Sequence, residues 1–148
     1  MTNIEREQIL VASILDDPQA KWGPNVSTAL AYAPDYWESV EAKPIAWAIV
    51  QFHVKGKIPD RLEIQAYLNK GAGGWFPEVS KFIEHPTFGP SNALPMSCAE
   101  TVAGELLPGY RDKQIRKTIG EAWEKLQRTP SAAREVAATL KYQLEAWV

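Results

Sequence analysis

The sequence has few of the features that mark exported or membrane-bound proteins. Cys98 is the only cysteine among 148 residues, so no disulfide can form within the chain, which fits a reducing compartment. The opening residues, MTNIEREQIL, show no basic segment followed by an apolar one, so we expect no secretory signal. No apolar run approaches the roughly 20 residues that a membrane-spanning helix needs. The sequence therefore predicts a cytoplasmic protein with no membrane partner.

Side chains with catalytic or metal-binding chemistry are also sparse. The two histidines, His53 and His85, lie far apart in the sequence, and neither has a Cys or another His at ligand spacing. We expect His53 to be a partly buried helix residue. Asp16 and Asp17 stand side by side before Pro18, a pattern that more often ends a helix than pairs two catalytic acids. The sequence therefore predicts no enzyme, no cofactor and no metal.

One glycine-rich run resembles a phosphate-binding loop only superficially. Gly71-Ala72-Gly73-Gly74 follows no strand and precedes no Lys-Ser or Lys-Thr pair, which a nucleotide-hydrolysing loop needs to hold phosphates and magnesium. We interpret this run as a flexible linker between helices. The chain is thus not expected to be an autonomous nucleotide-driven motor.

Helical periodicity is what the sequence does contain. Residues Pro44–Lys55 are apolar on nearly all sides, which predicts a central helix covered from several directions, with Gly56 as its left-handed cap. Asp60 and Glu63 have the spacing of a capping box and predict the start of a second helix that ends at Gly71. This pair of helices with its short connection is the most strongly marked local unit of the chain.

The remaining segments extend the same pattern. Thr2 and Glu5 form another capping box ahead of a first helix, and residues 75–84 predict a helix that buries Phe76. The loop His85–Pro95 is rich in proline and marks the best boundary in the chain. No stretch alternates in the manner of a strand. We expect an all-α fold with a compact multi-helix subdomain at residues 1–94 and an antiparallel helical hairpin at residues 95–148.

The hairpin is predicted from two helical patterns joined by a turn at Thr129–Ser131. Pro108 lies inside the first pattern and lacks a backbone N–H, so we expect a kink or a break there. From Arg111 onward the chain carries eight Lys or Arg against five Asp or Glu. The hairpin is therefore basic, at +3, whereas the preceding residues carry −5 of the net charge of −2.

The hairpin carries more apolar area than one seam between two helices requires. Such a surplus indicates a protein interface, unless the hairpin folds back on the globular part and buries it. Both alternatives stay open from the residues alone. The candidate interface residues are Tyr110, Ile115, Ile119, Trp123, Leu126, Val136, Leu140, Leu144 and Trp147.

A basic run in the first hairpin helix is the only indication of nucleic-acid binding. Acids interleave with it and aromatic residues are few, so a solvated helix face is the better interpretation and nucleic-acid contact the weaker one. The candidate contact residues are Arg111, Lys113, Arg116 and Lys117.

In order and spacing, the chain resembles the N-terminal domain of DnaB-type bacterial replicative helicases. The resemblance lies in an opening stretch in which a glutamate precedes an apolar run with a D-P stop, an aromatic pair before a helix, and a helix–G-x-x-P-D–helix–G unit. An asparagine-containing loop, a long helix with a basic centre and a closing helix follow. In this sequence these features are Glu7–Pro18, Tyr36-Trp37, Ile45–Gly71, the asparagine-containing loop at Asn92, and Arg111–Lys117.

This resemblance implies a non-catalytic DNA-replication module. In the family, such domains pair through their hairpins into a collar, bind a DnaG-type primase and contact loader proteins, so a homo-oligomer that docks primase, helicase or loader is expected here. Pro108-Gly109 departs from the unbroken helix of the family and puts the pairing mode in doubt. Any helicase activity would lie in a RecA-like motor, which this sequence does not contain.

Three alternatives remain. The chain could be a stand-alone phage or mobile-element protein that binds a host replicative helicase and modulates or inhibits it. It could be a weak nucleic-acid-binding domain that uses the basic hairpin. An enzyme acting through acidic residues is the least favoured, because no acid has an identifiable partner.

Overall fold

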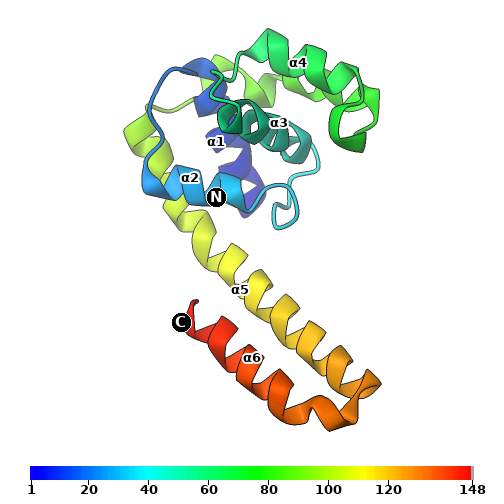
Figure 1. Cartoon of the computed structure of the whole chain (residues 1–148). Coiled ribbons are helices and arrows are strands. Elements are labelled where there is room, and N and C mark those ends of the chain that lie inside the picture. Colours follow the sequence, from blue (N-terminus) through cyan, green and yellow to red (C-terminus); the bar gives the residue numbers. More distant parts are fainter. Residues whose placement is uncertain (148) are drawn as a thin grey trace. The chain divides into compact units, whose positions relative to one another are not determined.

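The computed structural model describes residues Met1–Trp147 and contains helices but no strand within that range (Figure 1). The all-α prediction is confirmed. The chain divides into two compact units, Met1–Leu107 and Pro108–Val148, which we call the globular unit and the hairpin unit.

The long helix α5 contributes to both units, and the other helices belong to one unit each. The globular unit contains α1 (Asn3–Asp16), α2 (Pro24–Ala31), α3 (Ala42–Val54), α4 (Arg61–Asn69), the 3-10 helices η1 (Ala72–Gly74), η2 (Pro77–Glu84), η3 (Pro86–Phe88) and η4 (Pro90–Asn92), and the start of α5 (Met96–Arg128). The hairpin unit contains the rest of α5, η5 (Pro130–Ala132) and α6 (Ala133–Glu145).

Helix α1 begins as its capping box predicts. The Thr2 hydroxyl accepts the backbone N–H of Glu5 at 3.1 Å, which satisfies one of the donors that a helix start leaves open. Leu10 and Ile14, one helical turn apart, are fully buried, and the helix ends at Asp16. The apolar stripe of α1 therefore forms one wall of the core.

Helix α3 is the central helix that the sequence predicts. It buries side chains on most of its circumference, and Gly56, with φ of 72°, follows its end in the left-handed region. Asp60 then begins α4 by accepting the N–H groups of Leu62 at 2.9 Å and Glu63 at 3.2 Å. Both predicted helices and both predicted caps are confirmed.

Buried polar groups fix the segment between α2 and α3. The Glu7 carboxylate is fully buried and accepts the backbone N–H groups of Glu38 at 2.9 Å and Ser39 at 2.7 Å. The Trp37 indole N–H donates to the carbonyl of Ala29 at 2.9 Å. Because a buried polar group without a partner is costly, these bonds hold the irregular segment against α1 and α2.

The start of α5 belongs to the globular unit, which corrects the predicted boundary between residues 94 and 95. The Glu100 carboxylate accepts the N–H groups of Asn25 at 2.6 Å and Val26 at 3.0 Å and so caps α2. A Cβ at Gly23 would overlap this carboxylate. The His85–Pro95 loop marks where α5 begins, but a helix start need not be a unit boundary, because the first turns of α5 pack into the core.

Proline affects two local predictions: the break allowed at Pro108 does not occur, and the single helix over residues 75–84 is wrong. Helix α5 continues through Pro108, which is exposed, so water can solvate the carbonyl that loses its partner. Residues 75–84 form no single helix: Phe76 is extended and 77% exposed, and η2 starts only at Pro77. The ring of Pro77 disfavours helical backbone at the preceding residue.

Candidate functional site

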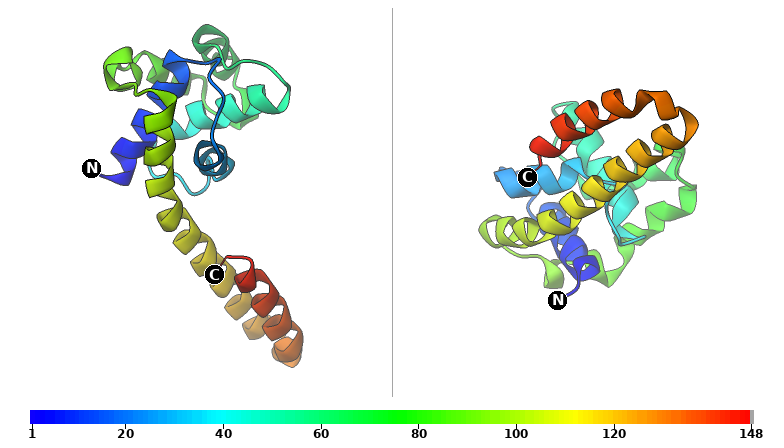
Figure 2. Two further views of the ribbon diagram at one scale, coloured as in Figure 1. Left: turned by 90° about the vertical axis from the view of Figure 1, so that its left-hand side faces the viewer. Right: turned by 90° about the horizontal axis from the view of Figure 1, so that it is seen from below.

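The hairpin unit consists of two antiparallel helices joined by a short turn. Figures 1 and 2 show α6 running back beside the C-terminal part of α5. Helix η5 makes the turn, and Lys125 Nζ lies 3.6 Å from Glu135 Oε1 across it. The buried side chains among the described residues of this unit are Tyr110, Thr118 and Val136. The hairpin is therefore a thin element with little interior of its own.

The predicted interface residues fall into different environments. Tyr110 is only 1% exposed and Val136 is also buried, so neither is available as a surface contact. Tyr110 and Val136 thus differ from the other candidates, because the apolar spacing that marks an interface also marks a core. The half-buried members are Ile115, Leu126, Leu140, Leu144 and Trp147.

Two members of the predicted set are strongly exposed. Ile119 is 46% and Trp123 63% exposed, and their spacing of four residues places them on the same face of α5. The structure therefore gathers the exposed apolar area of α5 at one place, which we call the Ile119/Trp123 face.

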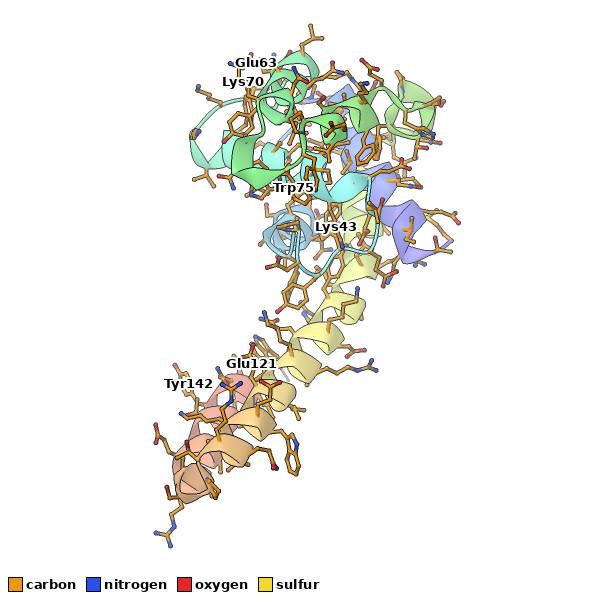
Figure 3. All side chains as sticks on the ribbon, turned by 90° about the vertical axis from the view of Figure 1, so that its right-hand side faces the viewer. Lys43, Glu63, Lys70, Trp75, Glu121 and Tyr142 are labelled. Atoms are coloured by element: carbon orange, nitrogen blue, oxygen red, sulfur yellow. The ribbon has the colours of Figure 1, made fainter. Side chains whose placement is uncertain are left out.

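A third exposed aromatic residue was missed by sequence reasoning. Tyr142 on α6 is 79% exposed and lies outside the apolar stripe of that helix, so the periodicity that identified the other residues could not find it. Figure 3 shows Tyr142 and Glu121 on the two helices of the hairpin. A large aromatic side chain away from the apolar stripe is the only signal that could have singled it out.

Helix α6 adds an open apolar groove. It is lined by the apolar residues Ala137, Leu140 and Leu144 and by the charged residues Lys141 and Glu145. These positions are three and four residues apart and therefore share one helix face. The groove offers apolar contact area flanked by one charge of each sign.

The predicted nucleic-acid residues are only partly brought together. At about 100° per residue, Lys113, Arg116 and Lys117 share one side of α5, whereas Arg111 points elsewhere. The shared side continues along the helix with an acidic residue, Glu124, about two turns beyond Lys117. The arrangement is a mixed-charge helix face rather than a continuous basic stripe.

The remaining sequence candidates show no catalytic arrangement. Among residues Met1–Trp147 no group of three or more His, Cys, Asp or Glu could hold a metal ion. His85 accepts the N–H of Thr87 and caps η3, and His53 is exposed rather than partly buried. The Gly71–Gly74 run forms a 3-10 turn in which Gly73 lies directly against the ring of Trp47. Its glycines therefore serve packing and backbone conformation.

None of the helices between Met1 and Trp147 is long and apolar enough to cross a membrane. Comparison of the chain with protein-family models, with curated proteins and with solved structures gives no match.

Proposed function

We propose that this chain is a non-catalytic association module of DNA replication that pairs with a second copy of itself through the hairpin unit and docks a DnaG-type primase, a DnaB-type helicase or its loader. The observation that carries the proposal is the disproportion between buried and exposed apolar side chains in the hairpin. The replication context comes from the sequence resemblance alone.

A helix as short as α6 needs a partner to be stable. An isolated helix of this length is marginal in water, and proteins hold such helices by packing an apolar face against a partner. Helix α6, with 13 residues, buries only Val136. Its groove and the Ile119/Trp123 face leave apolar area in water that a second chain could cover.

The exposed aromatic residues support a protein partner in particular. Trp and Tyr are enriched among the residues that dominate binding energy at protein interfaces. Trp123 and Tyr142 provide large, rigid contact areas on the two helices of one small unit. The interleaved charges of the hairpin would give register and specificity to such a contact.

Sedimentation of the full chain over a range of concentrations tests the association. We expect a monomer–oligomer equilibrium that the double variant Ile119→Ala/Trp123→Ala shifts toward monomer by at least about tenfold in dissociation constant, because residues of this type cost about 1–2 kcal/mol or more each when truncated at an interface centre. Leu62→Ala is the matched control, since Leu62 is an exposed apolar residue of the globular unit. A chain that stays monomeric at every concentration contradicts self-association.

Docking is tested by pull-down of purified DnaG-type primase and DnaB-type helicase with the parent chain, the Ile119→Ala/Trp123→Ala double variant and Leu62→Ala. Retention of either partner by the parent chain and by Leu62→Ala, with loss in the double variant, supports the proposal. If neither partner is retained by the parent chain, the replication assignment fails, even where self-association holds. Unwinding by intact helicase, measured with and without the chain, then separates a passive dock from an inhibitor.

A further inference from the structure

A cleft in the globular unit has no part in the hairpin proposal. It lies between the α1–α2 connection and the α3–α4 connection and is lined by eleven residues, among them Lys21, Trp22, His53 and Lys57. Its volume is about 400 Å³, within the range of sites that hold small molecules. The cleft is therefore large enough for a ligand of several rings or groups.

An aromatic stack forms one feature of this cleft. The rings of Trp22 and His53 have centroids 4.0 Å apart and an interplanar angle of 26°, a near-parallel stack of two side chains from different elements. Trp22 is half-buried and His53 is exposed, so the stack extends from the wall toward solvent. Stacked side chains of this kind continue readily into a planar ring of a ligand, because every base or similar ring offers a π-face.

The charges of the cleft have one sign. Lys21 and Lys57 are its fully charged lining residues, and no Asp or Glu lines it, although the whole chain has more acidic than basic residues. Lysine ammonium groups bind phosphate as point charges. The cleft therefore combines an aromatic stacking surface with two lysines, Lys21 from the α1–α2 connection and Lys57 from the α3–α4 connection.

We propose that this cleft binds a planar ring that carries a phosphate, the chemistry of a nucleotide. The ring would extend the Trp22/His53 stack, and the phosphate would lie toward Lys21 and Lys57. Such a group is supplied either by a free mononucleotide or by the end of a single-stranded nucleic acid. The cleft shares no residue with the basic run of α5 or with the Ile119/Trp123 face. The nucleotide proposal can therefore fail without affecting the association proposal, and the reverse also holds.

Calorimetric titration of the full chain tests the ring contact and the phosphate contact separately. The probes are adenosine monophosphate, adenosine and inorganic phosphate at low salt. We expect the monophosphate to bind more tightly than either of the others, by about fivefold or more, because stacking and phosphate contact then act together. Monophosphate binding no tighter than phosphate alone overturns the stacking role, and the proposal with it.

Variants at the cleft locate the binding. His53→Ala should weaken monophosphate binding about fivefold or more, while His53→Phe, which keeps a planar ring, should retain most of it. Lys21→Ala/Lys57→Ala should weaken binding several-fold and flatten its dependence on salt. Lys70→Ala is the matched control, an exposed lysine at the end of α4 that does not line the cleft (Figure 3).

Two further measurements complete the test. The first measurement is the affinity for a short single-stranded oligothymidine. If it binds more tightly than the monophosphate and loses that affinity in His53→Ala, the natural ligand is the end of a nucleic acid. If the oligothymidine and the monophosphate bind equally well, the natural ligand is a free nucleotide. The proposal is overturned if Lys70→Ala weakens monophosphate binding as much as the cleft variants do. It is also overturned if an acidic peptide displaces the monophosphate at the same concentration as a nucleotide does. Circular dichroism of each variant confirms that the helices are intact, and the exposed positions of His53, Lys21 and Lys57 favour this.

Discussion

Helices α3 and α6 have the same length and opposite environments. Each contains 13 residues, but α3 buries seven of them and α6 buries only Val136. Helix α3 gains its stability from the core around it, whereas α6 has one neighbouring helix and an apolar groove in water. The same helical periodicity in a sequence can therefore mark a buried core helix or a helix with an exposed apolar face. Only the elements packed around the helix distinguish the two.

The largest expected difference between the units comes from truncating one apolar side chain in each helix. Ile49→Ala removes a fully buried side chain of α3 and should lower the free energy of unfolding by about 2–5 kcal/mol. Leu144→Ala, at a half-buried site of α6, should cost less than about 1 kcal/mol in the monomer, since little packing is lost. Urea unfolding followed by circular dichroism at low protein concentration measures both. Equal losses would mean that α6 is packed as fully as α3.

Glycine substitutions should have opposite signs in the two units. Gly73→Ala should destabilise the globular unit by about 2 kcal/mol or more, because Gly73 has φ of 67° and a Cβ there would overlap Trp47. Gly120→Ala should stabilise the hairpin by up to about 1 kcal/mol, since this residue is exposed within α5 and has open space around it. Thermal unfolding of both variants gives the signs.

A control separates backbone strain from overlap at Gly73. Gly56 has φ of 72° but no atom within 4 Å of an added Cβ, so Gly56→Ala should show only the strain, about 1 kcal/mol. If Gly56→Ala and Gly73→Ala cost the same, the contact with Trp47 contributes nothing to the glycine requirement.

The smallest expected effects concern one surface ion pair in each unit. Arg6 Nε and Glu105 Oε2 are 2.9 Å apart in the globular unit, whereas Lys125 Nζ and Glu135 Oε1 are 3.6 Å apart and more exposed in the hairpin. Glu105→Gln should lower the free energy of unfolding by less than about 1 kcal/mol, and Glu135→Gln by less still. Melting temperatures at low and high salt measure both. A larger effect at Glu135 would show that the turn between α5 and α6 depends on this ion pair.

Local signals in the sequence predict the fold well where neighbouring residues are sufficient. The caps at Thr2 and Asp60, the left-handed position at Gly56 and the continuous apolar surface of α3 all depend on interactions within a few residues, and all are confirmed. Helical spacing is misleading at Phe76, because the following Pro77 disfavours helical backbone there.

The candidate site is predicted less completely, because exposure depends on distant contacts. Tyr110 and Trp123 both belong to the apolar set of the hairpin, but Tyr110 is buried and Trp123 is on the surface. Tyr142 has no periodic signal at all. No pattern along the chain assigns these three aromatic residues to their environments.

The order of residues is sufficient to specify an all-α chain with its caps, its central helix and its closing hairpin, because helix formation and capping act over one or two turns. Tertiary structure decides which apolar faces are covered, that the first turns of α5 belong to the globular unit, and that Trp22 meets His53 beside two lysines. The reason is physical: burial, stacking and the local balance of charge arise between segments that are distant in sequence and become neighbours only when the chain is folded.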